Sequence, residues 1–218
     1  MSKLLCPSMM CANFAKLGDE MRLLDDAGAD MFHVDIMDGS FVPNFGMGLQ
    51  DTQFIAKASS KPMDIHLMIQ EPGRYVRMFA DLGADIIYIH PEADIHAPRT
   101  LQTIIDAGAT PAIAINPGTA VETIRPLLHL AQYILVMTVN PGFAGQKYLS
   151  FVDDKIETLV NMKSYYGYRI IIDGACSPEK IQELGAKGAD GFILGTSALF
   201  GKDKPYDEIM QQLRAISE

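Results

Sequence analysis

The feature that most constrains the fold of this chain is a short phrase that recurs along it. Gly-Ala-Asp occupies residues 28–30, 83–85 and 188–190, each time directly before a short apolar run, and a looser copy, Gly-Ala-Thr, occupies residues 108–110. Each copy is typical of a helix that ends at a glycine, followed by a brief turn and a buried strand. The chain is therefore predicted to consist of repeated helix–strand units.

Apolar runs with the length and composition of buried strands occur eight times in the chain. They cover residues 4–7, 31–35, 62–69, 86–90, 111–115, 133–139, 168–173 and 191–195. Amphipathic stretches that predict helices lie between them, at residues 14–27, 72–82, 120–130, 151–165 and 178–187. Eight such units in 218 residues fit one α/β domain, a (β/α)8 TIM barrel over residues 1–218. An open doubly wound sheet is the alternative, but no Gly-x-Gly-x-x-Gly follows the first strand.

The charge and the cysteine count argue against several functional classes. A net charge of −9 leaves little basic surface for a nucleic-acid backbone, so no nucleic-acid partner is expected. The three cysteines include no Cys-x-x-Cys pair, which argues against a disulfide framework and a thiolate zinc site. The amino terminus has no signal-peptide pattern, and no apolar run is long enough to cross a bilayer. These features predict a cytoplasmic protein without a membrane partner.

The predicted strand ends carry an unusual set of polar residues, at the positions where barrels place their chemistry. His33 and Asp35 lie at the end of the second strand and, because side chains alternate, share one face. His66 lies near the end of the third strand, and Asp173 ends the seventh. Taken singly, each is more often a core residue or a cap, but several buried carboxylates are costly without a cation. Two imidazoles and two carboxylates predict one divalent metal ion, with Zn²⁺, Mn²⁺, Co²⁺, Fe²⁺ or Mg²⁺ favoured over Ca²⁺.

Three polar residues near this set receive other roles. Asp38 precedes Gly39 and is typical of a turn after the strand. Asp64 lies one inward-facing position deeper than His66, so we expect it to orient His66. His90 ends the fourth strand and is placed outside the metal ligands.

Glycine-bearing segments follow the last three predicted strands, at residues 139–146, 173–176 and 195–200. Barrels often bind phosphate with the loops after the seventh and eighth strands and a short helix N-terminus. Backbone N–H groups supply the positive charge in such a site, which suits an acidic chain. These segments therefore predict a phosphate site, and turn glycines without a ligand are the alternative.

Five phrases together resemble the ribulose-phosphate 3-epimerase family over essentially the whole chain. They are residues 6–8 (CPS), 33–44 (HVDIMDGSFVPN), 64–68 (DIHLM), 139–146 (VNPGFAGQ) and 172–174 (IDG). The resemblance implies a barrel of the ribulose-phosphate-binding type, an isomerase of carbohydrate metabolism that acts on a ketose phosphate, and a homo-oligomer, either a dimer or a hexamer.

The resemblance also implies a role for individual residues. The metal ligands would be His33, Asp35, His66 and Asp173. The catalytic acid/base pair would be Asp35 and Asp173. The substrate would be contacted by Ser8, Met37, Met68 and Met137. The phosphate would be bound by Gly142, Gly145, Gly174, Ala175, Gly195, Thr196 and Ser197.

Some phrases differ from the usual pattern of the pentulose-phosphate enzymes. Ala144 and Ala175 stand where those enzymes usually have glycine. Residues 90–92 (HPE), 137–139 (MTV) and 195–200 (GTSALF) are more similar to the D-allulose-6-phosphate 3-epimerase branch. We therefore predict D-allulose 6-phosphate as the substrate, converted to D-fructose 6-phosphate. The alternative is the conversion of D-ribulose 5-phosphate to D-xylulose 5-phosphate.

The implied reaction inverts C3 of the sugar, beside its ketone. It requires removal of a proton from one face of the sugar and delivery of a proton to the other, through a planar enediolate that a metal stabilises. Asp35 and Asp173 come from well-separated strands and suit these two tasks, and residues 142–147 are predicted to close as a lid. Two rivals remain. A decarboxylase or aldolase often uses a catalytic lysine, which the strand ends lack, and a non-enzymatic barrel would only bind the sugar phosphate.

Overall fold

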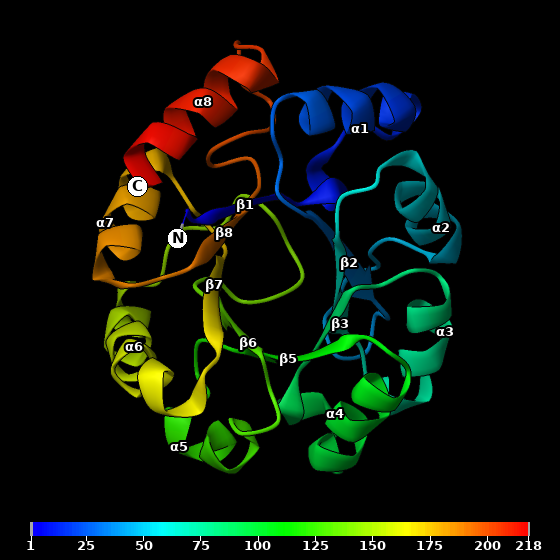
Figure 1. The fold of residues 1–218 in the computed structure, drawn as a ribbon, viewed down its shortest axis with the longest axis vertical. Coiled ribbons are helices and arrows are strands. Elements are labelled where there is room, and N and C mark those ends of the chain that lie inside the picture. Colours follow the sequence, from blue (N-terminus) through cyan, green and yellow to red (C-terminus); the bar gives the residue numbers. More distant parts are fainter. Residues whose placement is uncertain (1, 218) are drawn as a thin grey trace.

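A computed structural model describes residues 2–217 and places eight parallel strands around a central axis, with helices on their outer side (Figure 1). The strands are β1 (Leu4–Pro7), β2 (Phe32–Met37), β3 (Met63–Met68), β4 (Ile86–Ile89), β5 (Thr110–Ile115), β6 (Tyr133–Met137), β7 (Arg169–Asp173) and β8 (Gly191–Leu194). The helices are α1 (Leu17–Asp26), α2 (Leu49–Ala58), α3 (Val76–Asp81), α4 (Ala97–Asp106), α5 (Val121–Ile124), α6 (Asp153–Tyr166), α7 (Pro178–Lys187) and α8 (Tyr206–Ser217). The predicted (β/α)8 barrel is confirmed, and the open doubly wound sheet was wrong.

Several helices differ from the stretches that the pattern predicts. Residues 120–130 form only α5 and one 3-10 turn, because the ring of Pro126 removes a backbone donor and ends the regular ladder. Helix α2 had not been singled out, and its apolar stripe is narrow, since its buried residues are only Thr52 and Ile55. Within residues 2–217, no helix combines the length and apolarity that a membrane crossing requires.

The aspartates of the recurring Gly-Ala-Asp phrase share one structural task at the amino ends of the strands. The carboxylates of Asp30, Asp85 and Asp190 each accept a backbone N–H, at 2.8 Å, from the strand before their own. The backbone N–H groups of the same aspartates donate back to that strand. The glycine before each aspartate has a positive φ, as a helix-ending glycine requires. The repeat therefore joins neighbouring strands at this end of the barrel.

The barrel closes between β1 and β2, where the two strands are joined by an isolated bridge and not by a continuous ladder. Its ladder runs β1-β8-β7-β6-β5-β4-β3-β2, and the gap between the last and first strands is bridged by Ser8 and His33. The Oγ atom of Ser8 also donates to Asp35 Oδ2 at 2.8 Å, so a side-chain bond reinforces the closure. This seam lies among the predicted site residues.

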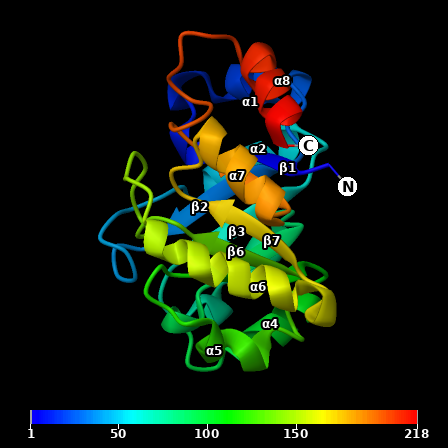
Figure 2. The same cartoon turned by 90° about the vertical axis from the view of Figure 1, so that its left-hand side faces the viewer.

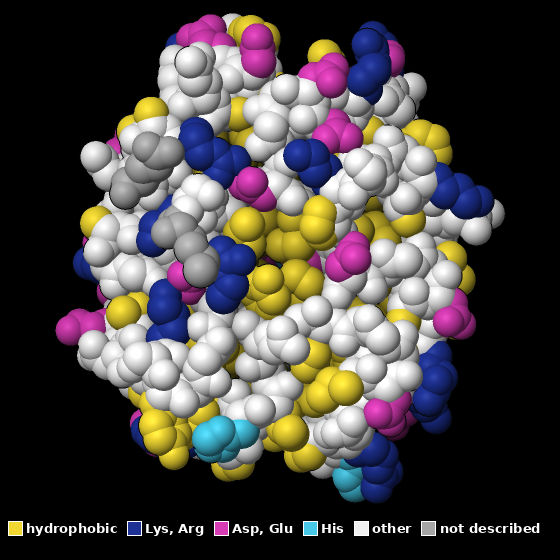
Figure 3. Space-filling model, in the orientation of Figure 1, with side chains coloured by type: hydrophobic (Ala, Val, Ile, Leu, Met, Phe, Trp, Pro, Cys, Tyr) yellow, Lys and Arg dark blue, Asp and Glu magenta, His cyan; other side chains and the backbone are white. Residues whose placement is uncertain are grey.

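The two ends of the barrel differ in character. Figure 3 looks onto the end from which the amino terminus emerges, and hydrophobic side chains gather at the centre of that face. Inside the barrel, residues such as Ala112, Leu135 and Ile171 are fully buried and fill the space between the strands. Figure 2 shows the arrowheads of β2 and β7 pointing to the opposite end, where the loops over residues 38–47 and 140–149 project. The carboxyl ends of the strands therefore face a loop-lined surface above a filled interior.

Candidate active site

Four predicted side chains from β2, β3 and β7 meet in one cluster. The strand β2 runs to Met37, so His33 and Asp35 lie within it rather than at the end that the sequence predicts. In the paired strands β2 and β3, His33 lies beside Asp64 and Asp35 beside His66, and Asp173 ends β7. One ligand atom from each of His33, Asp35, His66 and Asp173 lies within 4.8 Å of those of the others. Asp35 Oδ1 is 3.2 Å from both His33 Nε2 and His66 Nδ1. The predicted convergence is thus present in the structure.

Each of the two imidazoles presents one ring nitrogen to the cluster and uses the other elsewhere. Asp64 Oδ1 lies 2.5 Å from Nδ1 of His33, which leaves Nε2 of that ring for the cluster. His90 Nε2 lies 2.8 Å from Nε2 of His66, which leaves Nδ1 of that ring for the cluster. The expectation that Asp64 orients His66 was wrong, because the strand register sets Asp64 beside His33.

The arrangement fits a divalent cation. Nε2 of His33 is buried and makes no hydrogen bond within residues 2–217, although it lies 3.2 Å from Asp35 Oδ1. A buried imidazole nitrogen that faces carboxylates without a hydrogen bond is typical of a metal ligand, whereas a structural histidine in a core has both nitrogens hydrogen-bonded. Two nitrogen and two oxygen donors suit Zn²⁺, Mn²⁺, Co²⁺ or Fe²⁺.

The electrostatics of the cluster favour positive charge. Burial raises the pKa of Asp35, but His33 and His66 outweigh that effect and hold the pKa well below its usual range. Burial raises the pKa of Asp173 to about 6, with His33 opposing the shift and Asp35 adding to it. Burial lowers the pKa of His33, but Asp64 and Asp35 together raise it well above its usual value. The carboxylate field that favours a proton on His33 equally favours a cation.

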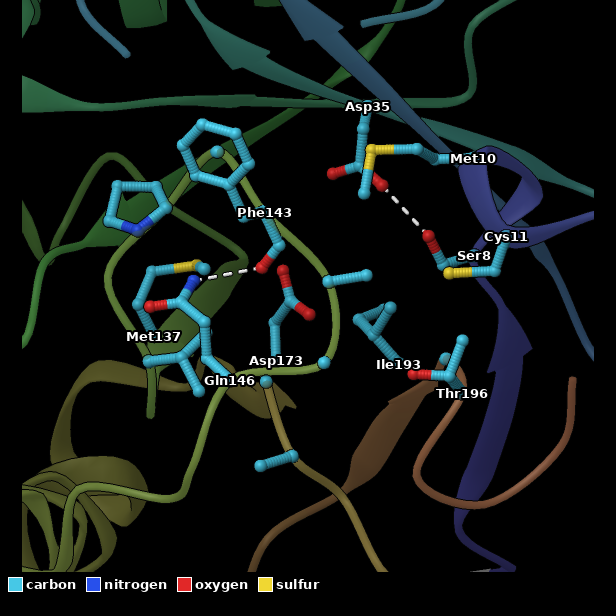
Figure 4. Close-up of a pocket in the computed structure, with 18 of the residues that line it drawn as sticks. Ser8, Met10, Cys11, Asp35, Met137, Phe143, Gln146, Asp173, Ile193 and Thr196 are labelled. Carbon is cyan, nitrogen blue, oxygen red and sulfur yellow. Dashed lines mark hydrogen bonds between the residues drawn. The ribbon is translucent and has the colours of Figure 1, made fainter. Parts of the chain in front are cut away.

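A pocket opens beside this cluster, and its wall includes Asp35 and Asp173 (Figure 4). The predicted substrate residues Ser8, Met37, Met68 and Met137 all line it. So do the predicted phosphate residues Gly142, Gly145, Gly174, Ala175, Gly195, Thr196 and Ser197. The pocket therefore joins the carboxylate cluster to the glycine-bearing loops in one continuous space.

Other lining residues had not been predicted: Met10, Cys11, Phe143, Gln146 and Ile193 all line the pocket. Phe143 and Gln146 belong to the phrase at residues 139–146, so their place in that phrase was the available signal. Met10 and Cys11 lie in a 3-10 turn directly after β1, and no sequence periodicity marks the direction of that turn.

The loops at the glycine end are held by specific hydrogen bonds. Gln146 Nε2 donates to the carbonyl oxygens of Asn140 and Phe143, at 2.6 and 2.8 Å, and so closes its own loop. Figure 4 shows Gln146 and Phe143 on the same wall of the pocket. Asn44 Nδ2 donates to Gly142 O at 2.7 Å and joins the loop after β2 to the loop after β6. Asp38 accepts backbone N–H groups from Ser40, Phe41 and Gln70, so its predicted turn role is confirmed.

Backbone conformation at this end requires glycine in places. Gly174 has a φ of +109°, and a Cβ there would lie 2.6 Å from Val139 Cγ2. Its neighbour Ala175 also has a positive φ, of 48°. The chain after β7 thus turns so tightly that even an alanine is held in the left-handed region.

A comparison with known protein families identifies the family to which this site belongs. The model of the ribulose-phosphate 3 epimerase family matches residues 4–200. This chain belongs to the ribulose-phosphate 3-epimerase family. The predicted family is confirmed, and so is the predicted enzyme class, an isomerase, at the level of the family.

Individual relatives match over most of their length. The ribulose-phosphate 3-epimerase of Rhodobacter capsulatus is 41% identical over 90% of this chain and 86% of its own. The enzyme of the same name from Bacillus subtilis is 39% identical, over 90% of this chain and 91% of its own. Among solved structures, 3-hexulose-6-phosphate synthase from Salmonella typhimurium superposes with a TM-score of 0.74 at 19% identity, covering 99% of this chain and 98% of its own. That likeness shows the barrel fold alone.

Proposed function

We propose that this chain is a metal-dependent 3-epimerase of a ketose phosphate, with Asp35 and Asp173 as its acid/base pair. The proposal is carried by one observation: two carboxylates from separate strands meet two imidazoles at the wall of one pocket. Membership of the family supports the reaction type, because the relatives are named for the epimerisation of ribulose phosphate.

The two aspartates are placed for proton transfer at opposite faces of a planar intermediate. They extend from β2 and β7, which are separated in the barrel wall by β1 and β8. One aspartate accepts the proton from one face of C3, and the other delivers a proton to the opposite face. In the reverse direction the roles exchange. The hydroxyl of Ser8 holds Asp35 Oδ2 in place, so Oδ1 faces the cluster.

A divalent ion would be held by His33 Nε2, His66 Nδ1 and one oxygen from each of the two aspartates. When bound, it supplies Lewis-acid stabilisation of the negative charge that develops on the sugar. Asp64 fixes the ring of His33 through Nδ1, as a carboxylate commonly does for a metal-binding imidazole. Metal analysis of the purified protein, followed by activity measurements with Zn²⁺, Mn²⁺, Co²⁺, Fe²⁺ and Mg²⁺, identifies the ion that supports the reaction.

The remaining pocket residues have separate tasks. Met37 and Met68 are buried together with Val42 and present flexible apolar side chains that exclude water while accepting either epimer. Gly142, Gly145 and Gly174 line the pocket and would offer their backbone N–H groups to a phosphate. The loop that Gln146 closes, residues 142–147, would act as the lid.

D-Allulose 6-phosphate is the proposed substrate, and D-ribulose 5-phosphate is the alternative. The support is the similarity of residues 90–92, 137–139 and 195–200 to the allulose-phosphate branch, and two of these segments contribute lining residues to the pocket. The ratio of kcat/KM for the two sugars, measured with the same metal, tests the choice. We expect at least about a tenfold preference for the hexulose phosphate, equal to 1.4 kcal/mol. A preference for the pentulose phosphate would contradict the proposal.

Reaction in deuterated water separates epimerisation from the rival activities. An epimerase incorporates deuterium at C3 and releases no fragment, whereas a decarboxylase or an aldolase releases one. A barrel that only binds sugar phosphate would be stabilised by the ligand without any solvent exchange. The described residues that line the pocket include neither lysine nor arginine, which disfavours a lysine-dependent cleavage.

Two further predictions concern the setting of the protein. The three cysteines are all free in the described chain, which supports a reducing compartment such as the cytoplasm. We also expect a homo-oligomer, either a dimer or a hexamer, by analogy with the family. Light scattering on the eluate of a size-exclusion column distinguishes these states from a monomer.

A further inference from the structure

His90 is a buried imidazole that the proposed mechanism does not use. It follows β4 and is fully buried, and its ring stacks on that of His66 with centroids 5.0 Å apart. Its Nε2 atom lies 2.8 Å from Nε2 of His66. Its other nitrogen, Nδ1, makes no hydrogen bond within residues 2–217 but lies 3.5 Å from Glu92 Oε2. The contacts therefore run from Glu92 through His90 to His66.

The distance between the two rings restricts where the protons can be. Two nitrogen lone pairs, or two N–H groups, would repel each other at 2.8 Å, so one proton lies between His66 and His90. Either His66 donates through Nε2–H, or His90 donates and His66 carries its proton on Nδ1, where Asp35 Oδ1 lies 3.2 Å away. In the first arrangement Nδ1 of His66 either is a lone pair or shares a second proton with Asp35, and only this arrangement lets Nδ1 bind a cation.

Glu92 favours the first of these arrangements. A carboxylate beside His90 Nδ1 favours an N–H at that position, because a lone pair there would face a negative charge. Neutral His90 then has its lone pair on Nε2, where it accepts the proton of His66. Glu92 thus favours a proton on Nε2 of His66, although it does not touch that ring.

Glu92 is itself held in position by the loop after β5. Its Oε1 atom accepts the backbone N–H of Asn116 at 2.9 Å and the hydroxyl of Thr119. Lys155, on α6, donates to the carbonyl oxygens of Asn116 and Pro117 at 2.6 and 2.8 Å. These contacts use one carboxylate oxygen of Glu92 and leave Oε2 directed toward His90.

We propose that Glu92 and His90 are positioning residues that hold a proton on Nε2 of His66 and so leave its Nδ1 for the cation site. The proposal rests on the proposed function in so far as that site binds a metal. The proton on Nε2 is held in the metal-free protein as well. The two can therefore be tested separately.

The first experiment reads the tautomer directly. Long-range ¹H–¹⁵N spectra of metal-free protein with ¹⁵N-labelled histidine distinguish Nε2–H from Nδ1–H, and His66→Asn assigns the His66 signals. We expect a protonated Nε2 in His66 of the unmodified protein, and a shift of that proton to Nδ1 in His90→Leu, which removes the acceptor. Glu92→Gln should give a mixture of the two forms. Glu122→Gln, at an exposed glutamate, is the matched control and should change nothing.

The second experiment measures Zn²⁺ affinity by competition with a chromophoric chelator. We expect His90→Leu to weaken binding about 10–100-fold, the usual effect of removing a partner of a ligating histidine, and Glu92→Gln to weaken it less. His90→Gln, whose amide oxygen can replace the lost acceptor, should restore most of the affinity. If His90→Leu does not fold, Glu92→Gln and His90→Gln carry both measurements.

The outcomes are distinct. An unprotonated Nε2 in His66 of the unmodified protein, or a proton position that neither substitution changes, overturns the proposal. Unchanged Zn²⁺ affinity in His90→Leu also overturns it. If the unmodified protein binds no Zn²⁺, Mn²⁺ or Co²⁺, the metal-dependent function fails, and the spectra of the metal-free protein still decide the tautomer.

Discussion

Aspartates occupy both ends of this barrel, but their surroundings differ. At the amino end, Asp30, Asp85 and Asp190 accept backbone N–H groups, and two of them also pair with a basic side chain. At the carboxyl end, Asp35 and Asp173 face imidazoles, and their pKa values shift in opposite directions. The first group uses its carboxylates to bind neighbouring strands, whereas the second forms the predicted metal site with His33 and His66. One residue type thus stabilises the barrel at one end and is available for chemistry at the other.

The largest expected effect comes from neutralising an aspartate at the carboxyl end. Asp35→Asn and Asp173→Asn keep the shape of the side chain but remove the acid/base group, so kcat should fall by about 10²–10⁴-fold. Circular dichroism should show an intact fold, because an asparagine at position 35 can still accept the hydroxyl of Ser8 and the backbone pairing of β2 and β7 is unchanged. Steady-state kinetics measures the loss, and near-normal turnover in either variant would rule out the two-base scheme.

Removal of the metal tests the same end without a substitution. Treatment with a chelator should abolish turnover, and the supporting ion should restore it. The ion should also stabilise the fold by about 2.7 kcal/mol at 100 times its Kd, because it binds only the folded protein. Thermal unfolding with and without metal measures the shift. Asp85→Ala should retain this stabilisation and Asp173→Asn should lose most of it, so an equal shift in both would contradict the assignment.

A substitution at the amino end should act on stability alone. Asp85→Ala leaves the backbone N–H of Met63 without the carboxylate that accepts it, which should cost about 1–3 kcal/mol in the free energy of unfolding. Urea denaturation measures the cost. Because the residue lies at the opposite end from the pocket, kcat/KM should remain within about twofold, well under the 1.4 kcal/mol of a tenfold change. A large loss of activity in a fully folded Asp85→Ala protein would contradict the separation of stability and chemistry between the two ends of the barrel.

The smallest expected effect concerns backbone strain at the glycine end of the site. Ala175 has a φ of 48°, which costs an alanine about 1 kcal/mol relative to glycine. Ala175→Gly should therefore raise the free energy of unfolding by about 1 kcal/mol or less. The gain is reduced because glycine has more conformational entropy than alanine in the unfolded chain. Ala144→Gly, in the loop after β6 and without a positive φ, is the control and should lower stability slightly. Equal changes in both variants would show that strain at Ala175 is not the cause.

The repeat and the strand ends were predictable because they depend on local patterns. Each unit combines a glycine that ends a helix with the apolar run that follows it, and both lie within about ten residues of the chain. The eight units could therefore be recognised without tertiary information. The positions of His33, Asp35, His66 and Asp173 within their strands followed from the same units. Helix lengths were less predictable, since a single proline shortened α5.

The partners of the imidazoles were not predictable from local patterns. Asp64 was expected beside His66 and instead contacts His33. His90 was expected outside the metal ligands, and the sequence did not indicate that it contacts His66. Both contacts join strands that are more than twenty residues apart in the chain. Their register depends on how all eight strands tilt and close, which no short segment contains.

The sequence alone determined that this chain forms eight helix–strand units, that its strands carry two imidazoles and two carboxylates, and that glycine-bearing loops follow the last strands. Tertiary structure decided that the repeat aspartates join neighbouring strands, that the barrel closes through Ser8 and His33, and which nitrogen of each imidazole faces the cluster. The physical reason is range: alternation and capping act between near neighbours in the chain, whereas closure and register require all strands to be in place together.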